Sequence, residues 1–153
     1  MRDEHLKDKM RVIHYLKAES HPGDQIYVWG FHALIYYLTG LPSPTRFVVN
    51  FPLMSRWGPF IWRDELMGDL DRARPAFIVV ERKDVVPTVT FTNLDSELFL
   101  NNFPQLNAFI SGSYTPVLEL NYYVIYRRRG FPEGTKKSHE PAQGTQISRR
   151  DGS

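Results

Sequence analysis

The chain has 153 residues, of which 42% are hydrophobic and 14% aromatic, so it is long and apolar enough to bury the core of one domain. Its 19 Lys and Arg residues nearly balance its 17 Asp and Glu residues, which argues against a nucleic-acid-binding protein. The absence of cysteine excludes disulfides, zinc-thiolate sites and thiol nucleophiles.

The first elements alternate between helix and strand. Leu6, Met10, Ile13 and Leu16 recur at helical spacing, which predicts an amphipathic helix that stops at the turn over residues 20–24. Residues 26–29 form a short apolar run before Gly30 and predict a strand that is buried on both faces. A second apolar helical face follows over residues 31–38, and residues 46–50 have the pattern of a second strand.

The later elements continue this alternation. An aromatic loop over residues 51–62 leads into a helix that should end near residues 74–75, because the residue before a proline is pushed out of the α region. Residues 76–80 are the clearest strand in the sequence. Short helices are expected to begin at Asp95 and at Pro104, followed by two adjacent antiparallel strands over residues 117–120 and 122–126.

This order predicts an α/β fold, namely a small three-layer sandwich with a mostly parallel sheet and a C-terminal antiparallel hairpin. Residues 1–129 are expected to form a single domain. Residues 130–153 contain almost no large apolar side chain and are expected to form a disordered polar tail. No apolar run approaches the roughly 18 residues needed to span a bilayer.

The search for chemistry is mostly negative. The turn after the first strand holds one glycine where a dinucleotide fingerprint requires three, and no phosphate-binding loop, nucleophile elbow or zinc-protease motif is present. The five histidines are scattered at spacings that no metal site explains. We therefore expect no cofactor and no metal site, and we assign no catalytic residue.

Three residues are candidates for binding a ligand: Trp29, His32 and Arg46. His32 lies just past the first strand, where open α/β sheets place their ligands, and Arg46 at the start of the second predicted strand can meet an anionic group. His32 and Arg46 each have a plainer alternative. His32 can be a helix-capping or partly buried histidine, and Arg46 can be a surface arginine paired with a carboxylate.

The loop over residues 51–62 carries unusually many large apolar side chains for a turn region. Four of them, Phe51, Trp57, Phe60 and Trp62, are candidates for contact with a membrane surface or with another domain. The alternative is that the loop folds back onto the core, since aromatic side chains are mostly buried.

One further pattern extends over residues 22–30, 35–40, 42–47, 75–80 and 123–128. Through these segments the chain resembles the C-terminal extracytoplasmic domain of GT-C membrane glycosyltransferases, of the dolichyl-phosphate-mannose protein mannosyltransferase and aminoarabinose transferase type. The resemblance is a pattern of turns and strands rather than a catalytic signature.

The resemblance implies a non-catalytic accessory domain of an enzyme that uses a polyprenyl-phosphate-linked sugar. Its partner would be the transmembrane region of the parent chain, with the membrane surface or the polyprenyl-phosphate sugar also in contact. Its location would be the extracytoplasmic face of the bacterial inner membrane. The alternative is an independent small-molecule-binding α/β protein with a pocket at Trp29, His32 and Arg46.

Overall fold

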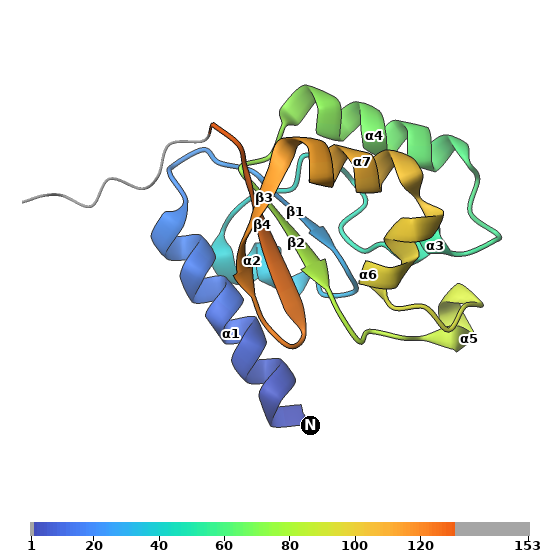
Figure 1. Cartoon of the computed structure of the whole chain (residues 1–153), viewed down its shortest axis with the longest axis horizontal. Coiled ribbons are helices and arrows are strands. Elements are labelled where there is room, and N and C mark those ends of the chain that lie inside the picture. Colours follow the sequence, from blue (N-terminus) through green and yellow to red (C-terminus); the bar gives the residue numbers. More distant parts are fainter. Residues whose placement is uncertain (1, 131–153) are drawn as a thin grey trace, which may run out of the picture.

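The computed structural model describes residues 2–130 (Figure 1). All but the first residue of the predicted tail therefore lies outside the described residues. The chain is mixed α/β, as predicted. Its elements are α1 (Arg2–Glu19), β1 (Ile26–Trp29), α2 (Leu34–Thr39), α3 (Phe51–Met54), α4 (Ile61–Ala73), β2 (Phe77–Glu81), α5 (Pro87–Thr90), α6 (Ser96–Phe99), the 3-10 turn η1 (Leu100–Asn102), α7 (Pro104–Ser113), β3 (Tyr114–Glu119) and β4 (Tyr123–Arg128).

The described strands form one mixed sheet in the order β1-β2-β4-β3. β1 and β2 are parallel, whereas β4 is antiparallel to both β2 and β3. The C-terminal antiparallel hairpin is thus confirmed, with an irregularity in β3 between Pro116 and Leu118. The expectation of a mostly parallel sheet is wrong, because only one of the three strand pairs is parallel.

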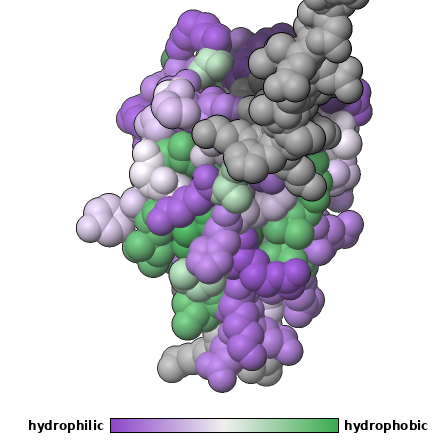
Figure 2. Space-filling model, turned by 90° about the vertical axis from the view of Figure 1, so that its left-hand side faces the viewer, coloured by the Kyte–Doolittle hydropathy of each residue, from purple (hydrophilic) through white to green (hydrophobic). Residues whose placement is uncertain are grey.

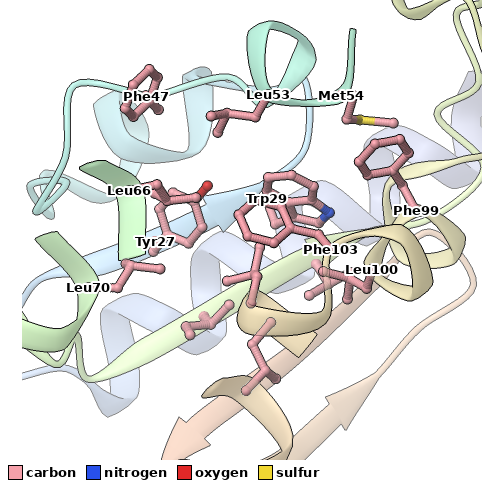
Figure 3. Packing of buried hydrophobic residues seen from close by; sticks show 14 of the residues in the cluster. Tyr27, Trp29, Phe47, Leu53, Met54, Leu66, Leu70, Phe99, Leu100 and Phe103 are labelled. Carbon is pink, nitrogen blue, oxygen red and sulfur yellow. The ribbon is translucent and has the colours of Figure 1, made fainter. Parts of the chain in front are cut away.

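Both faces of the sheet are covered by apolar side chains, because successive residues of a strand point to opposite faces. On one face, Tyr27, Trp29, Ile78 and Val80 pack with residues from α3, α4, η1 and α7, as Figure 3 shows for the centre of this cluster. The opposite face carries residues such as Val28 and Val79 and packs with α1 and α2.

The N-terminal helix buries only the second half of its predicted apolar face. Val12, Ile13 and Leu16 are buried, whereas Leu6 and Met10 are 56% and 40% exposed. Figure 2 views the side of the molecule on which α1 lies, and this side is mostly hydrophilic with separate hydrophobic patches. In the described part of the chain, no helix combines the length and the apolar content that crossing a bilayer requires.

The predicted second strand over residues 46–50 does not form. The segment 41–50 instead follows the outer edge of β1 as a bent chain, and its backbone makes isolated contacts there. Ile26 N donates to Pro42 O and Asn50 N donates to Gly30 O, both at 3.1 Å. Proline cannot donate to a ladder, and Ser43 Oγ bonds locally to the backbone of Thr45 instead.

Other predicted boundaries are confirmed. α4 ends at Ala73, and Arg74 adopts a left-handed conformation before Pro75. Asp95 caps α6, since its carboxylate accepts a hydrogen bond from Leu98 N at 2.8 Å. α7 begins at Pro104, where the missing proline N–H is not needed by the helix.

Candidate functional site

The parallel pair β1 and β2 places two polar residues at one end of the sheet. Figure 1 shows that both strands point toward the same end. Glu81 is the last residue of β2, and its side chain lies on the same face as Phe77 and Val79 because strand side chains alternate. His32 follows β1 after two residues. The topology therefore brings a carboxylate and an imidazole together at the carboxyl ends of parallel strands, where α/β sheets commonly bind ligands.

A third residue comes from α1. His5 shares the sheet-facing side of this helix with Asp8, Val12 and Leu16, at helical spacing. His5 Nε2 lies 3.2 Å from Glu81 Oε1, and His32 Nδ1 lies 2.6 Å from the same oxygen. The two imidazole rings are 4.8 Å apart between centroids. One carboxylate oxygen thus faces two histidines that are distant from each other in the sequence.

The backbone around Glu81 holds its carboxylate in place. Phe31 N donates to Glu81 Oε2 at 2.9 Å, so the second carboxylate oxygen is fixed from the turn after β1. Gly30 leaves the necessary room, because a Cβ atom at this position would lie 2.4 Å from Glu81 Oε2. The single glycine after β1 thus serves close packing of a carboxylate rather than a nucleotide phosphate.

The three residues line an open pocket of about 390 Å³, together with Phe31, Val85, Val86, Lys83, Asp84 and Tyr122. Glu81 is fully buried at the base, whereas the His5 and His32 side chains are 26% and 31% exposed. The edge of Tyr122 packs against His5, and Tyr123 Oη lies 3.1 Å from His5 Nε2. Lys83 contacts Asn121 and the Tyr122 ring. The pocket thus has a charged base and partly apolar walls.

Asp84 adds a second acid to this pocket. Its carboxylate accepts hydrogen bonds from Ser96 N at 2.7 Å and from Ser96 Oγ. Burial, followed by the negative charge of Glu81, raises the pKa of Asp84 from its ordinary value of 3.8 to about 6. The charged form of Asp84 is therefore disfavoured in the folded protein.

This shift predicts that the protein loses stability as the pH rises from about 4 to 6. Over this range the unfolded chain releases the Asp84 proton while the folded chain retains it, so the free energy of unfolding falls by up to about 3 kcal/mol from this group. Asp84→Asn should remove this contribution. Urea unfolding between pH 4 and 7 in the presence of a chelator measures it.

The control for this experiment is Asp71→Asn, which changes an exposed carboxylate on α4. The difference in unfolding free energy between Asp84→Asn and the unmodified protein should grow with pH, and it should grow by more than the difference for the control. Parallel pH profiles for all three proteins would contradict a raised pKa at Asp84.

Of the three predicted ligand-binding residues, the structure places only His32 at this pocket. Trp29 is fully buried on the opposite face of the sheet, and its Nε1 donates to Ser96 O at 2.7 Å. Arg46 lies on the surface, where its guanidinium makes a two-point pair with Glu65 at 2.8 and 2.9 Å. The plainer alternative for Arg46, a surface ion pair, therefore describes its position.

The four aromatic contact candidates divide into two groups. Trp57 and Phe60 are 54% and 80% exposed, in the turn between α3 and α4. Trp62 is half-buried and packs against the core, and the Phe51 ring is stacked on Phe31 with centroids 6.2 Å apart. Part of the loop thus folds back and part is displayed. Contact of the displayed part with a membrane or a domain remains a prediction.

Two residues of the site were missed by sequence reasoning. Glu81 carried a usable signal, because a carboxylate at the end of a buried strand that is parallel to β1 must lie near residues that follow β1. His5 carried a weaker one, because the predicted apolar face began at Leu6, whereas the buried side of α1 that His5 shares runs through Asp8, Val12 and Leu16. The spacing of histidines along the chain could not reveal a site that only the fold assembles.

Comparison with known proteins identifies a family. The family described as "Putative competence-induced protein Ccs4 C-terminal domain" matches residues 6–129, a range that includes His32 and Glu81 and begins one residue after His5. No curated protein and no solved structure matches the chain significantly.

The family match corrects the resemblance drawn from the sequence. The identification as a domain of a GT-C membrane glycosyltransferase was wrong, because the family that matches residues 6–129 is a different one. The resemblance rested on a pattern of turns and strands without a catalytic signature, and such a pattern does not identify a function. The transmembrane partner and the extracytoplasmic location were inferred from that resemblance, and nothing in the structure bears on either.

Proposed function

This chain belongs to the Ccs4 C-terminal domain family, and we propose that it is a ligand-binding domain that holds a divalent transition-metal ion through His5, His32 and Glu81. The proposal takes the domain as a three-layer sandwich, which is supported by the helices that pack on both faces of the sheet. The observation that carries the proposal is the convergence of two imidazole nitrogens on one buried carboxylate oxygen.

The donor set fits such an ion. One ligand atom from each of His5, His32 and Glu81 lies within 4.8 Å of the others. Two imidazole nitrogens and one carboxylate oxygen are a common ligand set for Zn²⁺ and for other divalent transition metals. Although His32 Nδ1 is 2.6 Å from Glu81 Oε1, the contact lacks hydrogen-bond angles, and this buried nitrogen has no hydrogen-bond partner in the described part of the chain. A shared metal ion would satisfy both atoms.

The electrostatics of the pocket also favour a cation. The Glu81 carboxylate is fully buried, and a buried charge requires a compensating partner. Asp84 and Asp8 add further negative charge nearby. Burial, followed by the negative charges of Glu81, Asp84 and Asp8, raises the pKa of Tyr123 well above its ordinary value. A divalent ion would neutralise more of this charge than either imidazole alone.

The site leaves room for a further ligand. Three protein donors leave a coordination position open on a tetrahedral ion, as in metal sites that bind water or a substrate. This position would face the open pocket, whose walls include Phe31, Val85 and Val86. The pocket therefore supports a small molecule that ligates the ion with a polar group and contacts the walls with an apolar one.

The test is a Zn²⁺ titration of the whole chain by calorimetry, after removal of bound metal with a chelator. We expect one ion per chain. His5→Ala, His32→Ala and Glu81→Gln should each weaken binding by more than about 100-fold, since the loss of an outer partner alone costs about 10- to 100-fold. His14→Ala is the matched control, because His14 lies on the exposed side of the same helix.

Two further measurements keep the result interpretable. Thermal unfolding in the chelator shows whether each variant is folded without metal. His139→Ala tests the one histidine that lies outside the described residues. Zn²⁺ binding that survives all three site variants, or its absence from a folded unmodified chain, would refute the proposal and leave Glu81 as a carboxylate paired only with its histidines.

A further inference from the structure

A second cavity, of about 230 Å³, lies between the turn from α3 to α4 and the segment that joins α5 to η1. None of the residues that line it belongs to the site formed by His5, His32 and Glu81. Its charged lining residues are Arg56 and Arg63, and no acidic residue lines it. The cavity therefore carries positive charge without a carboxylate of its own.

Arg63 is the fixed part of this charge. Its Nε and Nη2 atoms donate to Leu53 O at 3.2 and 3.0 Å, and Nη1 donates to Asn102 O at 3.2 Å. The guanidinium also lies over the Phe103 ring at 4.9 Å from the centroid. Burial lowers its pKa, and no carboxylate pairs with it among residues 2–130. These contacts hold the charge in place without neutralising it.

The hydrogen-bond inventory of Arg63 leaves capacity for a ligand. A guanidinium has five N–H donors, and three of them are used by Leu53 O and Asn102 O. One N–H on each terminal nitrogen remains. Arg56, exposed in the turn before α4, makes no ion pair within the described residues and supplies a second guanidinium. Two guanidinium groups, each able to donate paired N–H hydrogen bonds, match the charge and the oxygen atoms of a dianionic oxyanion.

The rim of the cavity is apolar. Phe60 is 80% exposed on one side and Phe91 is 67% exposed on the other. Phe91 has a φ of 57°, in the left-handed region that non-glycine residues rarely adopt. The chain thus displays an aromatic side chain from a strained backbone position, and such positions concentrate at binding sites.

We propose that this cavity binds a phosphate monoester that carries a small apolar group, with the phosphate between Arg56 and Arg63 and the apolar group against Phe60 and Phe91. The two charges of the phosphate match the two guanidinium groups, and the aromatic rim distinguishes an organic ester from inorganic phosphate. A free metabolite and a lipid headgroup both present this chemistry, and the size of the cavity favours the free molecule.

The test compares inorganic phosphate, phenyl phosphate and vesicles of phosphatidylcholine with or without phosphatidic acid. All measurements are made in a chelator, so that a metal at His5, His32 and Glu81 cannot supply the phosphate affinity. We expect phenyl phosphate to bind more tightly than inorganic phosphate and to shift the amide resonances of Gly58, Phe91 and Thr92. Arg63→Gln and Arg56→Gln should each weaken both ligands by about tenfold or more.

Further variants separate the parts of the site. Phe60→Ser should weaken phenyl phosphate alone, whereas Arg72→Gln, an exposed arginine on α4, should change neither ligand. If Arg63→Gln fails to fold, the Arg56→Gln variant tests the proposal, because Arg56 is exposed and makes no ion pair within the described residues. Binding only to phosphatidic acid, and dependent on Arg56, would assign the same site to a lipid headgroup. The proposal would be overturned if the protein bound neither phenyl phosphate nor phosphatidic acid. It would also be overturned if the Arg56 and Arg63 variants left the affinity unchanged.

Discussion

Replacing Trp29 with alanine is expected to lower the free energy of unfolding by about 4 kcal/mol, the largest effect among the substitutions considered. Trp29 is fully buried, and Figure 3 shows it surrounded by Phe99, Leu100 and Phe103. The Phe103 ring meets it edge-on at 5.8 Å between centroids. Removal of the indole would leave a large cavity that these neighbours cannot fill. Urea unfolding with a chelator present measures the loss.

Trp29→Phe separates the hydrogen bond from the packing. This variant keeps most of the buried ring but leaves Ser96 O without its donor, at an expected cost of about 1–3 kcal/mol. Neither variant should alter the Zn²⁺ affinity of the folded fraction, because the indole lies on the opposite face of the sheet from Glu81. If the Trp29 variants instead kept normal stability but lost Zn²⁺ binding, Trp29 would be a ligand contact, as the sequence predicted.

Gly30→Ala is expected to affect both stability and the site. The new methyl group would lie 2.4 Å from Glu81 Oε2 and 2.7 Å from Glu81 Cβ, distances that packed atoms do not adopt. Either the carboxylate leaves its position or β1 and β2 separate, and we expect a cost of about 3 kcal/mol. Because a shift of the carboxylate also moves Oε1, the oxygen that faces both histidines, Zn²⁺ affinity should fall by more than about 100-fold.

The control for this change is Gly112→Ala in α7, where an added Cβ meets no atom within 4 Å. Alanine is the better helix former, so this variant should be as stable as the unmodified chain or more stable by about 1 kcal/mol. It should bind Zn²⁺ normally. If Gly30→Ala behaved like Gly112→Ala, the tight packing of Glu81 against the turn after β1 would not exist in solution.

Local patterns predicted the elements whose residues alone decide their structure. The strand at residues 26–29, the end of α4 before Pro75 and the C-terminal hairpin all follow from apolar runs, a proline and a short connection. Residues 46–50 failed because a strand also requires a ladder partner. Next to β1 the segment 41–50 makes only isolated backbone bonds, and Pro42, Ser43 and Pro44, which precede residues 46–50, favour local turns.

The site was less predictable than the fold because it is made of contacts between distant parts of the chain. His5 and Glu81 are separated by 76 residues, and only the packing of α1 on the β2 face brings them together. His32 was identified from its place after β1, which is a property of topology. Trp29 and Arg46 were selected for their chemistry at neighbouring positions, and their side chains lie elsewhere, in the core and in a surface pair.

The segment 41–50 has a consequence for how this domain can meet other chains. By following the outer edge of β1, it occupies the donors and acceptors that an incoming strand would use, such as Ile26 N and Gly30 O. The opposite edge, β3, contains Pro116 and an irregular register, which oppose the pairing of a further strand. Both edges of the described sheet are thus protected against intermolecular strand addition. Self-association through edge-to-edge sheets, the route to fibrous aggregates, is therefore disfavoured at both edges.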